Sequence, residues 1–194
     1  MHAGRRPRVV AALILATFVA SLGGPATAAA QSGPIKIGLL APLTGAFAAL
    51  GKDMLNGTEL YLDEIGHQIA GRKIELIVED TEGNTATALT KARKLVDQDK
   101  IHVLTGGLLA STGYALHPFA DAQKIPTTYP VMASDDLTQR TPAKWVVRTG
   151  WATSQPMHPF AEWVAKNTKH RKSTTVALDY AFGWETVGTA PRST

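Results

Sequence analysis

The feature of this chain that most restricts its fold is a regular alternation of short apolar runs with longer amphipathic segments. Short apolar runs between turn residues indicate buried strands, and apolar residues at three- and four-residue spacing indicate helices packed on them. Strands and helices that alternate in this way form βαβ units around a parallel sheet, so the sequence predicts an α/β fold. The predicted strands are 35–40, 73–78, the start of 101–113, 125–129, 144–149 and 173–178. The predicted helices are 51–65, 86–98, 111–122 and 153–167, with the first turns of another within 179–188.

Residues 101–113 (IHVLTGGLLASTG) contain the clearest candidate for a binding site. An apolar strand runs into a Gly-Gly turn, and a helix is predicted to begin at Ser111 and Thr112. Unpaired backbone N–H groups and the positive end of the helix dipole favour a small anion such as a carboxylate there. The alternative is that Ser111 only caps its own helix, as hydroxyl residues at such positions often do. The residues themselves leave both interpretations open.

The first thirty residues have the pattern of a secretory signal peptide. Arg5, Arg6 and Arg8 form a basic region, an apolar stretch follows at 9–22, and small residues at 26–30 offer an A-x-A cleavage site. An uncleaved membrane anchor is the alternative, but the apolar stretch is short for a bilayer span. The sequence therefore predicts export to the periplasm.

Charge and cysteine content exclude several functions. Without the three arginines of the leader, 17 basic residues stand against 16 acidic ones, and this near balance argues against nucleic acid as a partner. The chain has no cysteine, so lipoprotein attachment, disulfides and thiolate metal sites are excluded. No two of the six histidines have the spacing of a helical metal site.

No motif for catalysis is present either. No serine lies in a G-x-S-x-G turn, and the Gly106-Gly107 turn is neither a dinucleotide fingerprint nor a phosphate loop. The acidic pairs Glu79-Asp80 and Asp135-Asp136 are sequence neighbours whose side chains tend to point apart. The second pair, after Ser134, is typical of a capped first turn of a short helix. The sequence therefore predicts that the protein is not an enzyme and that it binds no metal or cofactor.

Five segments in order carry a resemblance to a known family. They are IKIGLLAPLTGAFAALG, the Glu79-Asp80 pair, TGGLLAST, PVMASDDLT and DYAFGWE. From Ile35 to about Gly188, the chain resembles the branched-chain amino-acid type of periplasmic solute-binding protein, the leucine-binding-protein-like receptor of an ABC importer. The resemblance implies the periplasmic-binding-protein-like I fold, in which two α/β lobes close on an amino acid or a related small carboxylate. It also implies permease and ATPase subunits as partners.

The resemblance assigns ligand contacts to two parts of the first lobe. The serine that binds the ligand's carboxylate falls on Ser111 or Thr112, and on Ala110 if the alignment shifts by one residue. The aromatic residue that often lines the first loop is replaced by Leu50, with Phe47 nearby as its stand-in.

Two further segments are expected to complete the site. In the family, one segment binds the ammonium group through a backbone carbonyl and a hydroxyl, and it falls on residues 131–133, which begin at Val131. Ala133 occupies the usual threonine position, and Ser134 is the neighbouring substitute. In the second lobe, Tyr180 and Phe182 match the position of an aromatic cover. The DYAFGWE spelling and the altered ammonium segment resemble the branch that includes receptors for aromatic acids and other carboxylates.

The resemblance also predicts the domain organisation. Residues 1–30 are the signal peptide, 31–149 the first lobe and 150–194 the start of the second lobe. Because only the first of the family's three crossings between lobes is present, we expect this chain not to form a closed cleft and to have low stability. A ligand-sensing regulatory domain of the same fold, or less favourably a doubly wound enzyme, are the alternatives. A regulatory domain would not need neighbouring permease and ATPase genes.

Overall fold

The structure of the protein is a computed structural model that describes residues 33–170, 172 and 174–189. The predicted signal peptide lies outside the described residues. Within them, no helix combines the length and the apolar character needed to cross a membrane.

A six-stranded sheet forms the centre of the described structure, in the order β2-β3-β1-β4-β5-β6. Neighbouring strands from β3 to β6 are parallel, and only the short β2 is antiparallel to its neighbour β3. The parallel arrangement predicted from the alternating pattern is therefore confirmed. The strands are β1 Ile35–Ala41, β2 Gln68–Ile69, β3 Arg72–Asp80, β4 Val103–Gly106, β5 Thr127–Tyr129 and β6 Val146–Arg148.

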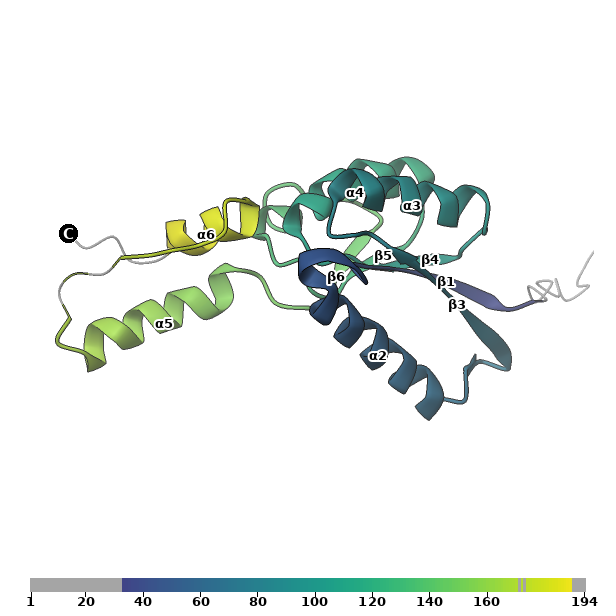
Figure 1. Cartoon of the computed structure of the whole chain (residues 1–194), viewed down its shortest axis with the longest axis horizontal. Coiled ribbons are helices and arrows are strands. Elements are labelled where there is room, and N and C mark those ends of the chain that lie inside the picture. Colours follow the sequence, from purple (N-terminus) through teal and green to yellow (C-terminus); the bar gives the residue numbers. More distant parts are fainter. Residues whose placement is uncertain (1–32, 171, 173, 190–194) are drawn as a thin grey trace, which may run out of the picture. The chain divides into compact units, whose positions relative to one another are not determined.

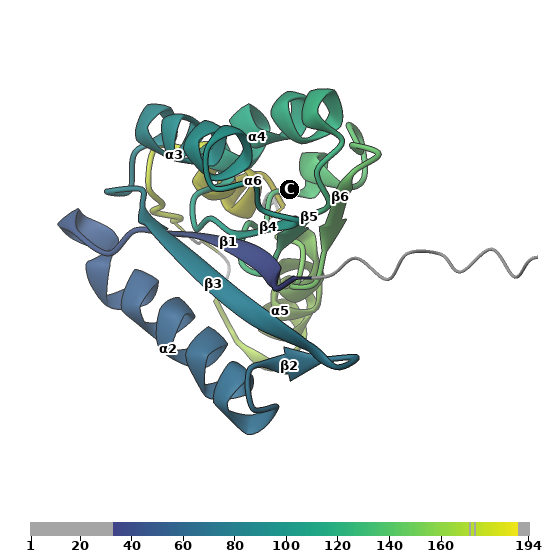
Figure 2. The same ribbon diagram turned by 90° about the vertical axis from the view of Figure 1, so that its right-hand side faces the viewer.

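Helices cover both faces of this sheet. In Figures 1 and 2, α2 lies on one side of β1 and β3, and α3 and α4 lie on the other. The start of α3 is fixed by Asn84, whose side-chain oxygen accepts hydrogen bonds from the backbone N–H groups of Ala86 and Thr87. The helices are α2 Ala48–Glu64, α3 Thr85–Asp97, α4 Ala110–Gln123, α5 Ser154–Asn167 and α6 Ala181–Thr189, with 3-10 turns η1 Gly45–Phe47 and η2 Asp135–Leu137.

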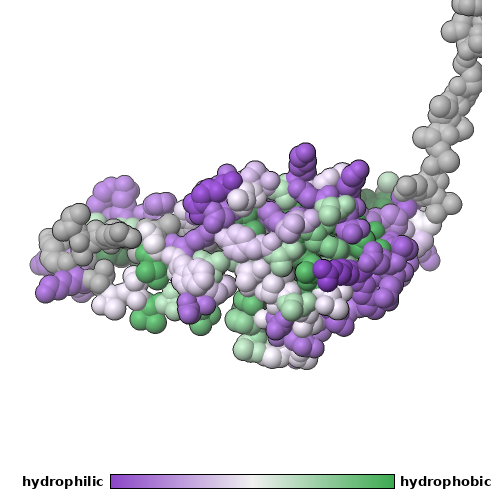
Figure 3. All heavy atoms as spheres, turned by 90° about the horizontal axis from the view of Figure 1, so that it is seen from above, coloured by the Kyte–Doolittle hydropathy of each residue, from purple (hydrophilic) through white to green (hydrophobic). Residues whose placement is uncertain are grey.

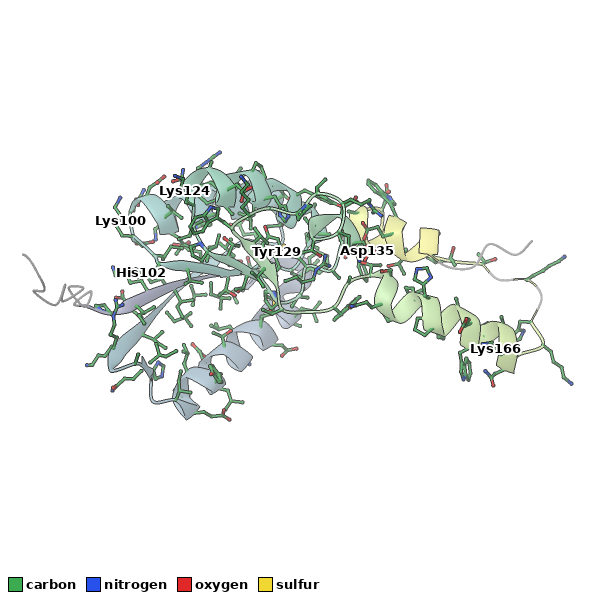
Figure 4. The ribbon with its side chains drawn as sticks, turned by 180° about the vertical axis from the view of Figure 1, so that it is seen from behind. Lys100, His102, Lys124, Tyr129, Asp135 and Lys166 are labelled. Atoms are coloured by element: carbon green, nitrogen blue, oxygen red, sulfur yellow. The ribbon has the colours of Figure 1, made fainter. Side chains whose placement is uncertain are left out.

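The main hydrophobic core lies between the sheet and the pair α3 and α4. Leu40 and Leu104 from the strands pack with Leu95 and Leu116 from the helices, all of them almost fully buried. Tyr129, labelled in Figure 4, is fully buried among them. Burial of these side chains fixes α4 against the sheet, and α4 in turn positions the candidate site described below.

The chain after β6 is far less buried. None of the residues of α5 is buried, and Phe160 and Trp163 are each 57% exposed. Figure 3 shows hydrophobic residues interspersed with hydrophilic ones on the surface seen from above. The stability of the described structure therefore comes mainly from the sheet and its three flanking helices.

Three local predictions were wrong. Residues 68–69, which lie between the predicted helix 51–65 and the predicted strand 73–78 and were assigned to neither, pair with β3 as a short hairpin. Helix α2 begins at Ala48, three residues before the predicted start. Residues 174–178 of the predicted last strand are irregular, and Val176 is 95% exposed. An apolar run becomes a strand only where a neighbouring strand pairs with it, and no described strand lies beside this one. Ser173, its first residue, lies outside the described residues.

Candidate ligand-binding site

The candidate site lies where β1, β4 and β5 end. These strands are parallel, so their carboxyl ends meet at one edge of the sheet. The chain places β3 on one side of β1 and then β4 on the other, which makes the β1–β4 boundary a topological switch point. Ligands of open α/β sheets bind beyond the carboxyl ends of the strands at such a point.

Two glycines make the turn between β4 and α4. Gly106 and Gly107 have φ angles of +98° and +77°, in the region that disfavours residues with a Cβ atom. A Cβ on Gly106 would also lie 2.3 Å from the carbonyl oxygen of Leu40 in the neighbouring strand. The Gly-Gly pair therefore lets the chain turn away from the sheet close to β1 and begin α4 at Ala110, three residues after Gly107.

A partly open cavity of about 150 Å³ lies at this edge of the sheet. Its wall comes from η1 and the first turn of α2, from the loops after β4, β5 and β6, and from the residues at the start of α4 and α6. None of the lining side chains carries a charge at neutral pH, and burial raises the pKa of the one phenol among them, Tyr180. The lining residues are Phe47, Leu50, Leu108, Leu109, Ala110, Val131, Ala133, Trp151, Tyr180 and Phe182.

The structure brings most of the sequence-predicted site residues to this cavity. Seven of the ten predicted residues line it, from four separate parts of the chain. Their contacts with a ligand stay a prediction. The seven are Phe47, Leu50, Ala110, Val131, Ala133, Tyr180 and Phe182.

Ser111 and Thr112 do not line the cavity. The N-cap of α4 is Leu109, which makes no side-chain capping bond, so the alternative that Ser111 caps its own helix was wrong. The Ser111 hydroxyl instead accepts a hydrogen bond from the hydroxyl of Thr85 at 3.1 Å, and Thr112 is buried. Ala110, the residue given by the shifted alignment, occupies the first position of α4 and lines the cavity.

Ser134 is not among the lining residues either. It is fully buried, and its hydroxyl lies 2.6 Å from the Tyr114 hydroxyl and 2.7 Å from a carboxylate oxygen of Glu185. It is the N-cap of η2, as predicted, but its side chain does not bond that turn. A hydroxyl with two such partners is already satisfied without a ligand.

Sequence reasoning missed Leu108, Leu109 and Trp151. The two leucines lie between the glycine turn and α4, a segment to which the sequence analysis assigned no ligand contact. The Trp151 ring lies 5.9 Å from that of Phe182 in an edge-to-face arrangement, a favourable geometry for aromatic pairs. No local pattern indicates this pairing, because 31 residues separate its members.

Asp80 holds the loop that carries Phe47. One of its carboxylate oxygens accepts hydrogen bonds from the backbone N–H groups of Leu43 and Glu82, both at 2.8 Å, and the other accepts from the Thr44 hydroxyl at 2.6 Å. Burial alone would raise the pKa of Asp80, but these hydrogen bonds outweigh it and lower the pKa. The charged carboxylate is thus the form that fits the native loop.

We expect replacement of Asp80 by alanine to lower the free energy of unfolding by about 1 kcal/mol, since the carboxylate is partly screened by water. Its pKa is lower in the folded chain, so its contribution is complete above the unfolded pKa of about 3.9 and is lost as the pH falls through the folded value. Urea unfolding at pH 7 and pH 3 measures both effects. An equal difference between variant and parent at the two pH values would contradict this role.

The described residues offer no group of three or more metal-ligating side chains. The candidate site is thus a small apolar cavity next to the amino-terminal end of a helix.

Comparison with known proteins then identifies the family. Residues 34–193 match the family described as periplasmic binding protein. The chain belongs to this family. It is 31% identical over 172 residues to the Leu/Ile/Val-binding protein BraC3 of Rhizobium johnstonii, covering 88% of this chain and 46% of that protein.

Solved structures show the same fold. A solute-binding protein of an ABC transporter from Rhodopseudomonas palustris BisB5, in complex with 3,4-dihydroxybenzoic acid, matches with a TM-score of 0.76 and 30% identity, over 80% of this chain and 42% of that one. Another from R. palustris, in complex with benzoate, matches with a TM-score of 0.76 and 32% identity, over 81% and 43%.

The predicted fold class, periplasmic-binding-protein-like I, is confirmed by these matches. The relatives just named are binding proteins rather than enzymes, as the sequence predicted for this chain. The chain spans less than half the length of each of them.

Proposed function

We propose that this chain is part of the extracytoplasmic receptor of an ABC importer and that its cavity binds a small aromatic carboxylate. The observation that carries this proposal is the combination of an uncharged, apolar cavity with the amino-terminal end of α4 at its wall. In this proposal the sheet with α2, α3 and α4 is the first lobe, and α5 and α6 begin the second. The receptor itself lies in the periplasm, and its partners are the membrane permease and the ATPase subunits of the importer.

The size and lining of the cavity favour a single ring. An apolar cavity of about 150 Å³ is large enough to bind benzene. Here the volume is also about 150 Å³, and Phe47, Trp151 and Phe182 contribute aromatic faces and edges to its wall. Aromatic side chains pack favourably against a ligand ring in offset or edge-to-face geometry.

The charge pattern favours a carboxylate without an ammonium group. Leu109 and Ala110 place the first turn of α4 at the cavity, where unpaired backbone N–H groups and the helix dipole stabilise an anion. None of the lining residues is acidic, so an ammonium group would lose its water without gaining a carboxylate partner. The two benzoate-type complexes among the structural relatives support the same class.

Ligand-observed NMR on the purified chain tests this proposal. We expect magnetisation transfer to benzoate with a Kd of about 1 mM, since the cavity is partly open and a Kd in that range corresponds to only about −4 kcal/mol. Benzamide, which lacks the charge, should bind at least about fivefold more weakly. Phenylacetate should also bind. Phenylglycine, which is phenylacetate with an added ammonium group, should not bind. Equal transfer to phenylacetate and phenylglycine would refute the proposed ligand class.

A further inference from the structure

The carboxylate of Glu185 joins two segments that lie far apart in the chain. One of its oxygens accepts a hydrogen bond from the Ser134 hydroxyl at 2.7 Å, and the other accepts from the Asp135 backbone N–H at 2.8 Å. Glu185 belongs to α6, whereas Ser134 and Asp135 begin the turn η2 after β5. Figure 4 shows the labelled Asp135 beside the end of α6. Each carboxylate oxygen thus has its own donor from the same turn.

The receiving turn is itself firmly held. The Ser134 hydroxyl is fully buried and lies 2.6 Å from the hydroxyl of Tyr114 on α4. Burial and the nearby negative charges of Asp136 and Glu185 raise the pKa of Tyr114, so its hydroxyl stays protonated. The Tyr114 proton is shared between the Ser134 hydroxyl at 2.6 Å and a carboxylate oxygen of Asp136 at 3.3 Å. Because Ser134 donates its single hydroxyl proton to Glu185, Tyr114 is the donor in its bond with Ser134. Hydrogen bonds to a charged acceptor are stronger than those between neutral groups.

The same turn also binds the start of α5. The Asp135 carboxylate accepts hydrogen bonds from the backbone N–H and the hydroxyl of Ser154, at 3.2 and 3.1 Å. One residue earlier, the carbonyl oxygen of Ala133 accepts from the backbone N–H and the hydroxyl of Thr153, at 2.8 and 2.9 Å. Residues 133–135 therefore hold both helices that follow β6, and Ala133 itself lines the cavity.

Glu185 follows Phe182 by three residues on α6, a spacing that puts two side chains on the same face of a helix. Phe182 and Tyr180, at the start of that helix, form one wall of the cavity. A helix held at Glu185 therefore holds these aromatic rings in place.

We propose that Glu185 is a positioning residue of the binding cavity, whose carboxylate fixes α6 on the turn at Ser134 and Asp135 and thereby holds Tyr180 and Phe182 over the cavity. The first part of this inference needs no ligand, and the second rests on the proposed function. It assigns a role to Ser134 that differs from the ligand contact predicted from the sequence.

The ligand-free test compares Glu185→Ala with the parent chain by NMR. We expect the NOEs between the rings of Phe182 and Trp151 to be lost and the amides of α6 to exchange with solvent about tenfold faster, while the exchange of β1 and β4 amides stays unchanged. Glu185→Gln, which has one acceptor oxygen in place of two, should retain part of the protection. Ser134→Ala should show a smaller loss from the other side of the same contact.

The matched control is Glu162→Ala on α5. Glu162 is 74% exposed and pairs only loosely with Lys166 at 3.5 Å, so its removal should leave α6 unchanged. Intact NOEs between Phe182 and Trp151 and unchanged α6 exchange in Glu185→Ala would overturn the proposal.

A benzoate titration separates this inference from the proposed function. If the parent chain binds benzoate, Glu185→Ala should bind it at least about fivefold more weakly, and an unchanged affinity would overturn the positioning role. If the parent chain binds no aromatic acid, the proposed function fails, and the ring NOEs and α6 exchange still decide whether Glu185 holds the aromatic wall.

Discussion

Replacement of Gly106 by valine is expected to unfold the protein at 25 °C. Gly106 has a φ of +98°, which a β-branched residue adopts only with severe strain. Its Cβ would lie 2.3 Å from the carbonyl oxygen and 3.0 Å from the nitrogen of Leu40, both of them backbone atoms at the centre of the sheet. Neither atom can move without breaking the β1–β4 pairing, so the free energy of unfolding should fall by more than about 4 kcal/mol. Circular dichroism and urea unfolding measure this loss.

Gly57→Ala is the matched control for this prediction. Gly57 lies in the middle of α2, and a Cβ there would meet no atom within 4 Å. Because alanine favours a helix over glycine, this variant should be more stable by about 0.8 kcal/mol. A folded Gly106→Val protein with unchanged stability would show that the β4–α4 turn differs from the one described.

Replacement of Ala133 by leucine is expected to abolish benzoate binding without unfolding the sheet. Ala133 is 4% exposed and lines the cavity, so the added carbon atoms would occupy the space assigned to the ring. We expect the Kd for benzoate to rise at least tenfold, with overpacking costing about 1–3 kcal/mol of stability. Ligand-observed NMR gives the affinity, and thermal unfolding shows that the protein remains folded.

Ala165→Leu adds the same atoms at an exposed position of α5, away from the cavity. Its benzoate affinity should equal that of the parent chain. If both leucine variants bind benzoate as the parent does, the ligand does not occupy the cavity at Ala133.

The family resemblance assigned residues that line the cavity, and strand order explains why those residues lie together. Apolar runs predicted β1, β4 and β5, and parallel strands place their carboxyl ends at one edge. Phe47, Val131 and Ala133 come soon after those ends and therefore meet at the cavity. The apolar pattern is local information and predicted the strands, whereas the residues assigned to the ligand came from the family resemblance.

The predicted start of α4 was one residue late for a physical reason. Leu109 caps this helix without a side-chain hydrogen bond, so the usual polar signal for a helix start is missing. Because Ser111 and Thr112 carry hydroxyls, the sequence predicted that α4 begins at Ser111, one residue after its actual start at Ala110. At 3.6 residues per turn, a shift of one residue turns a side chain by about 100°, enough to move it out of the cavity wall.

Long-range contacts could not be predicted from local pattern. One partner of the Ser134 hydroxyl is Glu185, 51 residues later, and the rings of Trp151 and Phe182 are 31 residues apart in the chain. Likewise, residues 174–178 have the composition of a strand, yet whether an apolar run pairs depends on the neighbours that the fold supplies.

The most direct measurement of the central claim is the position of benzoate on the protein. In a chain with labelled methyl groups, intermolecular NOEs from the benzoate ring protons should reach the methyl groups of Leu109, Ala110, Val131 and Ala133, which line the cavity. A separate hollow beside His117 and Ala143 provides the contrast. NOEs from benzoate to Ala143 and none to Ala110 or Ala133 would contradict the account.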